Sequence, residues 1–123
     1  MTSGGFHSFE HRWALAQAFQ LHLQIGRARV AARVHALNRQ LKEGLVTMSH
    51  VRLHTPGDEN LSAGLVCFEV NGLPPPTVVA RLRASSIIAT LTPYSPTYAR
   101  LAPGLLNSPE EVEVVLAAIR ALA

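Results

Sequence analysis

The segment from residue 8 to residue 25 is apolar on almost every side when it is placed on a helix, and this feature constrains the fold more than any other. At about 100° per residue, its apolar side chains surround most of the helix axis. A chain of 123 residues can hardly bury such a helix alone, so we expect a partner surface, either a second copy or another polypeptide. The ten apolar residues are Phe9, Trp13, Ala14, Leu15, Ala16, Ala18, Phe19, Leu21, Leu23 and Ile25.

The rest of the chain alternates between helix and strand patterns. Ser8 can cap the first helix, and Gly26 marks a break before a second helix from about Arg27 to Glu43, where Gly44 is the expected stop. The apolar stripe of this second helix is Val30, Val34, Leu37, Leu41 and Leu45. Strands are predicted over 51–55, 62–70, 87–91 and 98–101, and helices over 76–85 and 109–122.

This order predicts an α+β fold in which a long N-terminal helical segment precedes a small, mostly antiparallel sheet with helices packed on one face. We expect residues 1–26 to form a helix that packs on a large domain or partner, and residues 27–123 to form a small α+β domain.

Composition excludes several classes of protein. Hydrophobic residues make up 48% and charged residues 15%, which indicates a packed core rather than a disordered tail. No apolar run reaches the roughly 18 residues of a membrane span, and no secretory signal precedes the first helix, so we expect a cytoplasmic protein and no membrane partner. The lone Cys67 lies in an apolar strand, which predicts a buried and inert thiol.

The chain is basic, with a formal charge of +3, and Lys42 is its only lysine. Five basic residues crowd the second helix on the side away from its apolar stripe, where a solvated face is expected: Arg27, Arg29, Arg33, Arg39 and Lys42. No aromatic residues interleave with them, so a surface on which bases could stack is missing. We therefore do not expect nucleic-acid binding.

The histidines do not predict a metal site. His7 and His11 are four residues apart near Glu10, but no third ligand accompanies them, so we expect no metal. His50 and His54 flank a predicted strand and are expected to face solvent. No Gly-x-Ser-x-Gly, P-loop or Gly-x-Gly-x-x-Gly motif is present.

The C-terminal part places Arg100 in a short apolar strand before a turned loop and a helix start. Ser108 can cap that helix, Pro109 suits its first turn, and Glu111 lies three residues after the cap. A strand arginine beside such a rigid corner can bind a carboxylate through two parallel hydrogen bonds. The alternative is a structural arginine that flanks a buried strand with its charged head in water.

Several segments follow one another along the chain: Gly4-Gly-Phe-His-Ser-Phe-Glu-His-Arg-Trp13, Ile25-Gly26-Arg27, Leu53-His-Thr-Pro56, Leu61-Ser-Ala-Gly-Leu-Val-Cys-Phe68, Arg100, and Asn107-Ser108-Pro-Glu-Glu111. In this order they resemble the C-terminal part of class V aminotransferase-like enzymes. These enzymes use pyridoxal 5′-phosphate (PLP) and have fold type I; cysteine desulfurases, selenocysteine lyases and isopenicillin N epimerase-like proteins belong to them.

The resemblance implies a small domain together with the long helix that leads into it from a large domain. It implies that Arg100 binds the substrate α-carboxylate and that Asn107 and Ser108 support the loop. Ala102 and Leu106 depart from the serine and tyrosine frequent in the family, which leaves the substrate class open. The family's phosphate-contacting Gly-Thr segment would fall near Gly4-Gly5-Phe6-His7, without the threonine.

PLP chemistry requires a lysine that forms a Schiff base and a cradle for the phosphate. Lys42 lies on the expected solvated face, and the family places its lysine in the large domain. We therefore do not expect this chain to bind PLP or to be catalytic alone. The chain is expected to be a fragment or one half of a split enzyme, paired with a large-domain chain or with a second copy through the 8–25 helix and acting on an amino acid once assembled. The alternative is a free-standing, non-catalytic interaction or dimerisation module derived from that fold.

Overall fold

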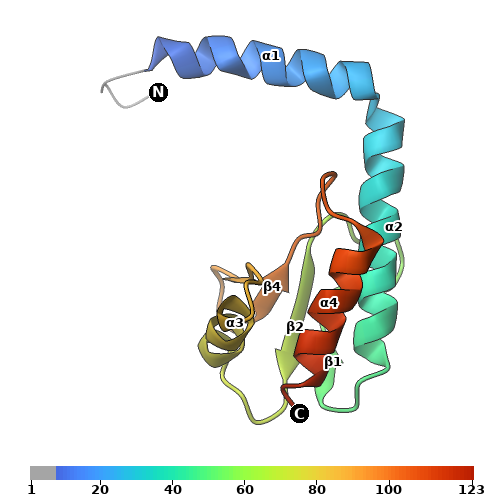
Figure 1. The fold of residues 1–123 in the computed structure, drawn as a ribbon, viewed down its shortest axis with the longest axis vertical. Coiled ribbons are helices and arrows are strands. Elements are labelled where there is room, and N and C mark those ends of the chain that lie inside the picture. Colours follow the sequence, from blue (N-terminus) through green and yellow to red (C-terminus); the bar gives the residue numbers. More distant parts are fainter. Residues whose placement is uncertain (1–7) are drawn as a thin grey trace. The chain divides into compact units, whose positions relative to one another are not determined.

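A computed structural model describes residues 8–123, and the chain divides into two compact units, Met1–Ala31 and Ala32–Ala123. Along the chain (Figure 1) the elements are α1 (Phe9–Ile25), α2 (Arg27–Val46), β1 (Val51–Leu53), β2 (Val66–Val70), α3 (Pro75–Ala84), β3 (Thr90–Leu91), β4 (Ala99–Leu101) and α4 (Pro109–Arg120). Their order is the predicted one, and the α+β class is confirmed.

The helix α1 has no buried residue. Its aromatic side chains are more than half exposed, with Trp13 at 70% and Phe19 at 61%. Ser8 stands at the cap position, but its hydroxyl donates to Glu10 Oε2 at 2.7 Å instead of accepting from the helix backbone. Gly26 ends the helix with φ of +93°, a backbone conformation that glycine adopts without strain, so the predicted break is confirmed.

The second unit contains a four-stranded sheet in the order β1-β2-β4-β3, with every neighbouring pair antiparallel. The strands β2 and β4 occupy the centre. Side chains of a strand alternate between the two faces of a sheet. In β2, Val66, Phe68 and Val70 are fully buried, whereas the residues between them are only partly buried. One face of the sheet is therefore the core face, and the other lacks a helical cover within this unit.

The three helices α2, α3 and α4 contribute to one hydrophobic core on that face (Figure 1). The predicted stripe of α2 is confirmed for Leu37, Leu41 and Leu45, which are at most 2% exposed. From the other two helices the core takes Val78, Leu82, Val112, Leu116 and Ile119. Burial of these apolar surfaces provides the main stabilisation of the unit.

The expected stop at Gly44 is wrong, because α2 continues to Val46. A Cβ atom at position 44 would collide with the side chain of Leu116 on α4. Gly44 therefore allows α2 and α4 to approach closely rather than ending the helix. The helix closes two residues later, where Thr47 Oγ1 donates to Gly44 O at 2.7 Å.

The four strands lie within the predicted ranges but are shorter. The apolar residues before Val66 belong to the loop that follows β1 and make no ladder with a neighbouring strand. In the part of the chain that the structure describes, no helix combines the length and apolar character needed to cross a membrane.

Candidate functional site

Arg100 is the central residue of β4, with Ala99 and Leu101 buried on either side of it. Its side chain therefore points to the face of the sheet opposite the core. In the ladder it stands opposite Cys67 of β2 and Thr90 of β3. Its Nε donates a hydrogen bond to Thr90 Oγ1 at 3.0 Å.

The Arg100 guanidinium has no ionic partner in the described part of the chain. Among residues 8–123, no carboxylate forms an ion pair with it. Thr90 occupies Nε, so the two terminal nitrogens remain for a ligand. A guanidinium presents such nitrogens as a planar fork that matches the two oxygens of a carboxylate.

The loop after β4 is closed by Asn107. Its Oδ1 accepts from the backbone N–H of Gly104 at 2.8 Å, and its Nδ2 donates to Glu111 Oε2 at 3.0 Å. The backbone oxygen of Asn107 accepts from Arg33 Nη2 of α2 at 2.7 Å. Both ends of this side chain are thus used within the loop, which agrees with a supporting position, although its functional role stays a prediction.

The predicted helix start is confirmed as a reciprocal capping box. Ser108 Oγ accepts from Glu111 N at 3.2 Å, and Glu111 Oε2 accepts from Ser108 N at 2.9 Å. The backbone hydrogen bond from Ser108, together with the side-chain hydrogen bond from Asn107, lowers the pKa of Glu111. The corner that follows Arg100 is therefore fixed to the start of α4.

An open groove of about 660 Å³ begins beside Arg100 and Thr90. It runs past the end of α3, where Ser85 and Ser86 lie, and along α4. Ser86 has φ of +61°, a left-handed conformation that disfavours residues other than glycine. Its N–H donates to Arg83 O, and the next N–H, of Ile87, donates to Leu82 O, so these residues terminate α3.

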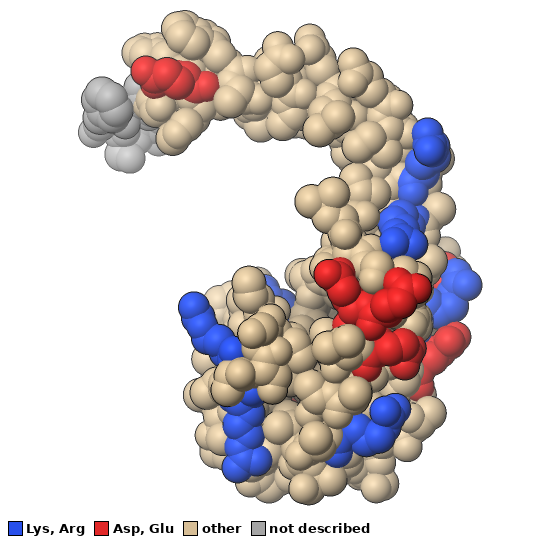
Figure 2. Space-filling view, viewed as in Figure 1, with Lys and Arg blue, Asp and Glu red and all other residues tan. Residues whose placement is uncertain are grey.

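Acidic and basic side chains are interspersed on the surface of this unit and do not form one large patch of a single sign. Figure 2 shows acidic side chains gathered over the start of α4, between separate groups of basic side chains. The acidic residues of that helix start are Glu110 and Glu111. On this face the basic residues therefore form no continuous stripe of the kind that follows a nucleic-acid backbone.

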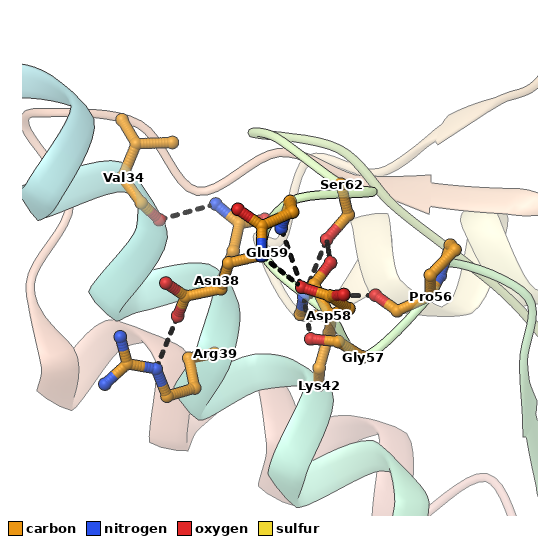
Figure 3. Close-up of polar contacts among 10 residues, drawn as sticks. Val34, Asn38, Arg39, Lys42, Pro56, Gly57, Asp58, Glu59 and Ser62 are labelled. Atoms are coloured by element: carbon orange, nitrogen blue, oxygen red, sulfur yellow. Dashed lines mark hydrogen bonds and ion pairs between the residues drawn. The ribbon is translucent and has the colours of Figure 1, made fainter.

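The expectation that Lys42 lies on a solvated face is wrong. The residue is only 5% exposed, and its Nζ donates to Pro56 O at 3.2 Å, Gly57 O at 2.9 Å and Ser62 Oγ at 2.8 Å (Figure 3). All three hydrogens of the ammonium group therefore have acceptors in the loop after β1. Nearby, Arg39 Nε donates to Glu59 Oε1 at 2.6 Å on the exposed side of the same loop.

Lys42 is buried because the buried side of α2 is wider than its apolar stripe. Asn38, 1% exposed, also lies on this buried side, and its Nδ2 donates to Val34 O at 2.8 Å. On a helical wheel Lys42 lies about 40° from Asn38 and about 60° from Leu45. A loop covers this edge of the stripe, which apolar periodicity alone does not reveal.

The expectations for the two histidines that flank β1, His50 and His54, and for Cys67 also need correction. His54 stacks on Tyr98 with ring centroids 3.9 Å apart, and its Nε2 lies 3.4 Å from Glu69 Oε2 without hydrogen-bond geometry. His50 Nε2 lies 3.2 Å from Ile119 O, so neither ring faces open solvent. Cys67 is only partly buried, because it points to the uncovered face beside Arg100.

Two sequence predictions concern residues outside the described part of the chain, namely the Gly4–His7 segment and the His7 member of the histidine pair. Within residues 8–123, no group of three histidine, cysteine or acidic residues is placed to hold a metal ion. Arg100 and Asn107 both line the groove, whereas Ser108 caps α4 outside it, and the predicted shared role of the three residues stays a prediction. The structure adds two contacts that sequence reasoning missed: Thr90 meets Arg100 through the pairing of β3 with β4, and Arg33 reaches Asn107 across 74 residues of sequence.

Comparison with known proteins gives structural matches only; no family model and no curated protein sequence matches the chain. A cysteine desulfurase from Thermococcus onnurineus is similar with 29% identity and a TM-score of 0.74, over 80% of this chain and 27% of that one. The cystine C-S lyase C-DES, in complex with its reaction product cysteine persulfide, is similar with 26% identity and a TM-score of 0.72, over 84% of this chain and 27% of that one. A variant of C-DES carries glycine covalently linked to its PLP cofactor.

A NifS-like protein matches more of the chain at lower identity. It covers 97% of this chain and 34% of its own, with a TM-score of 0.80 and 16% identity, and so shows the fold alone. The chain spans about a quarter to a third of the length of these structures. The resemblance to part of a cysteine desulfurase-like, PLP-dependent enzyme is thereby confirmed.

Proposed function

We propose that this chain is the small-domain part of a PLP-dependent enzyme of the class V aminotransferase and cysteine desulfurase type, and that Arg100 holds the α-carboxylate of an amino-acid substrate. The observation that carries the proposal is the state of the guanidinium. Thr90 fixes its Nε, and no carboxylate of residues 8–123 pairs with the rest. A partly buried cation with its fork unused is suited to a bidentate anion.

The chain does not fit PLP by itself. Covalent attachment of this cofactor requires a lysine whose amine is accessible and free to react. Lys42 is the only lysine, and its Nζ is buried in hydrogen bonds to Pro56, Gly57 and Ser62. The reactive lysine would therefore come from polypeptide beyond these 123 residues, and the chain is catalytically incomplete alone.

The helix α1 supports the same proposal independently. Within its own unit none of its 17 residues is buried, although most are apolar. Exposed apolar surface of this extent marks an interaction site. Its partner is a large-domain polypeptide in the enzyme proposed here.

The carboxylate role is tested with the isotopically labelled full chain and L-alanine, followed by the NMR signal of the Arg100 Nε–H group. We expect alanine to shift this signal, whereas L-alaninamide, which lacks the carboxylate, leaves it in place. Arg100→Gln should abolish the response of neighbouring Thr90, and Arg120→Gln, a change of an exposed arginine at the end of α4, should preserve it. Equal responses to alanine and alaninamide would contradict the proposal.

If the large-domain partner is found, the assembled enzyme gives a second test. Arg100→Gln should lower kcat/KM by roughly 30- to 1,000-fold, the equivalent of about 2–4 kcal/mol for one side of a hydrogen-bonded charge pair. Arg120→Gln again serves as the control. Unchanged KM and kcat in the Arg100 variant would overturn the role of Arg100.

A second candidate is a non-catalytic dimerisation module, favoured by α1 and by the engagement of Lys42. In that case the α1 surface is covered by a second copy of the chain. Light scattering over a range of concentrations separates the two: a dimer dissociated by Trp13→Glu but not by Val46→Glu supports the module. A chain that stays monomeric until a large-domain polypeptide is added supports the split enzyme.

A further inference from the structure

The groove lined by Arg100 and Thr90 is mostly apolar. Its lining includes the aliphatic residues Ile87, Ile88, Leu101, Val112 and Val115, and the polar residues Ser85, Ser86, Asn107 and Glu111. Ile87, Leu101 and Val112 belong to the buried core, whereas Ile88 is 88% exposed. An aliphatic group lying in the groove would remove apolar surface from water on both sides.

The charges at the groove select the kind of molecule that fits it. Arg100 supplies a cation without an ionic partner among residues 8–123. Glu111, the acid in the lining, is already engaged by Asn107 Nδ2 and by the backbone N–H of Ser108. The complementary ligand therefore carries one carboxylate at one end and an apolar chain at the other, since a second charge would lie against aliphatic walls without a partner.

We infer that this groove determines substrate specificity, by holding the aliphatic side chain of an amino acid whose α-carboxylate lies on Arg100. The inference rests on the proposed function, because the same arginine anchors the substrate in both. It adds that the preferred substrate has an apolar side chain. A polar side chain of similar size lying against Ile88 or Val115 would lose water without gaining a hydrogen-bond partner there. Elsewhere in the lining, such a partner could come from Ser85, Ser86 or Asn107.

The test uses straight-chain carboxylates as probes of the two halves of the groove. The labelled full chain is titrated with acetate, propionate, butyrate, pentanoate and hexanoate at constant pH and ionic strength, and Kd is read from NMR shifts. From propionate onward, each added methylene should lower Kd by roughly fourfold, the gain for moving one methylene out of water. Hexanamide, which has the same length and no charge, should bind more weakly than hexanoate.

Ile88 and Leu61, both exposed, provide a matched pair of variants. Ile88→Ser removes an aliphatic wall at a position where folding does not depend on the side chain, and it should flatten the dependence of Kd on chain length. Leu61→Ser changes a residue that is 71% exposed and lies outside the groove, and it should leave that dependence intact. The methyl signals of Leu101 and Val115 should shift with hexanoate and not with acetate.

The outcomes separate this inference from the proposed function. If all carboxylates bind alike through Arg100 and Ile88→Ser has no effect, the carboxylate role of Arg100 is supported and the preference for an aliphatic side chain is contradicted. If Kd depends on length but Arg100→Gln leaves it unchanged, the anchor falls, and with it the inference. Length dependence lost in Ile88→Ser, together with charge dependence lost in Arg100→Gln, supports both.

Discussion

Lys42 and Arg100 belong to the same packed unit, but the fold uses these two cations in opposite ways. Lys42 is buried and donates all three of its hydrogens to a loop of the same chain. Arg100 is partly exposed, makes one side-chain hydrogen bond, to Thr90, and has no ionic partner in residues 8–123. A cation whose donors are all used inside the fold is a structural element, whereas one held in place with unused donors is available to a ligand.

The loops after β1 and after β4 are held in place by different kinds of contact. The loop after β1 is tied to α2 through the buried ammonium group, whose acceptors are uncharged. The loop after β4 is tied through partly exposed contacts of Asn107, Ser108 and Glu111. The first loop should therefore depend on one residue, and the second on several contacts that each contribute little.

The largest expected effect follows from removing Lys42. Lys42→Met keeps the aliphatic stem but leaves the buried acceptors of Pro56, Gly57 and Ser62 without their donor, which should lower the free energy of unfolding by about 3 kcal/mol. Arg100→Met should lower it by about 1 kcal/mol or less, because Thr90 is exposed and water can replace the lost bond. Urea denaturation of both variants measures the difference.

Equal losses in these two variants would remove the distinction between a structural cation and a free one. Arg39→Met offers a control on the same helix and the same loop, since Arg39 pairs with Glu59 at the surface. Its effect on stability should be much smaller than that of Lys42→Met, because exposed ion pairs contribute little.

The two cations also differ in how far the sequence predicts them. The helices and the stripe Leu37, Leu41 and Leu45 follow from periodicity, because a helix repeats its core face every three to four residues. Periodicity predicts the wrong face for Lys42, since its acceptors come from a loop 14 to 20 residues later and no local pattern encodes that contact. A prediction from apolar residues alone makes the buried side of a helix too narrow when buried polar residues lie at its edge.

The capping box was predictable because all its members lie within four residues, from Ser108 to Glu111. Thr90 was not, because its position opposite Arg100 depends on the register of β3 and β4, which the connecting turn sets. The helical residues 44–46 were missed for a similar reason. Gly44 ends a helix by local preference, but packing against Leu116 overrides that preference here.

A smaller loss of stability is expected at the corner after Arg100. Ser108→Ala removes the acceptor for the Glu111 N–H and should lower the free energy of unfolding by about 1 kcal/mol. Ser108→Gly should lower it by only a few tenths of a kcal/mol, as at other helix caps. Thermal or urea unfolding measures both. A loss as large as that of Lys42→Met would show that this corner, too, depends on one residue.

Backbone strain beside the groove gives an effect of the opposite sign. Ser86 has a left-handed φ of +61° at the end of α3, is exposed, and occupies a position at which glycine is preferred. Ser86→Gly should raise the free energy of unfolding by about 0.5–1 kcal/mol. Ser85→Gly is the control, because its φ of −95° carries no such strain and glycine there should be neutral or destabilising. Stabilisation by both changes would place the effect elsewhere than in the strain of Ser86.

The smallest effect is a pH dependence confined to the Arg100 corner. The hydrogen bonds from Ser108 and Asn107 lower the pKa of Glu111 below its ordinary value of 4.5, so the unfolded chain takes up the proton at a higher pH than the folded one. The contribution of Glu111 to stability is therefore complete above pH 4.5 and is lost as the pH falls from there through the lower pKa of the folded state. Glu111→Gln keeps a capping-box side chain but does not titrate. The difference in unfolding free energy between the wild type and this variant should shrink between pH 5.5 and pH 3, by an amount on the order of a surface interaction.

The other carboxylates with lowered pKa are Glu10, Glu59 and Glu110, and they titrate in both proteins. Glu10 and Glu59 cancel in this difference, whereas the charge of Glu110 acts on Glu111 and contributes a small part of it. The same comparison between the wild type and Lys42→Met should show a smaller slope over that range, because Lys42 donates to uncharged oxygens and its charge is only a minor cause of the lowered pKa of Glu59. A slope in the Lys42 comparison equal to that for Glu111 would mean that the two loops are coupled. In that case Arg100 would depend on the buried cation for its position, and the two corners would act as one site.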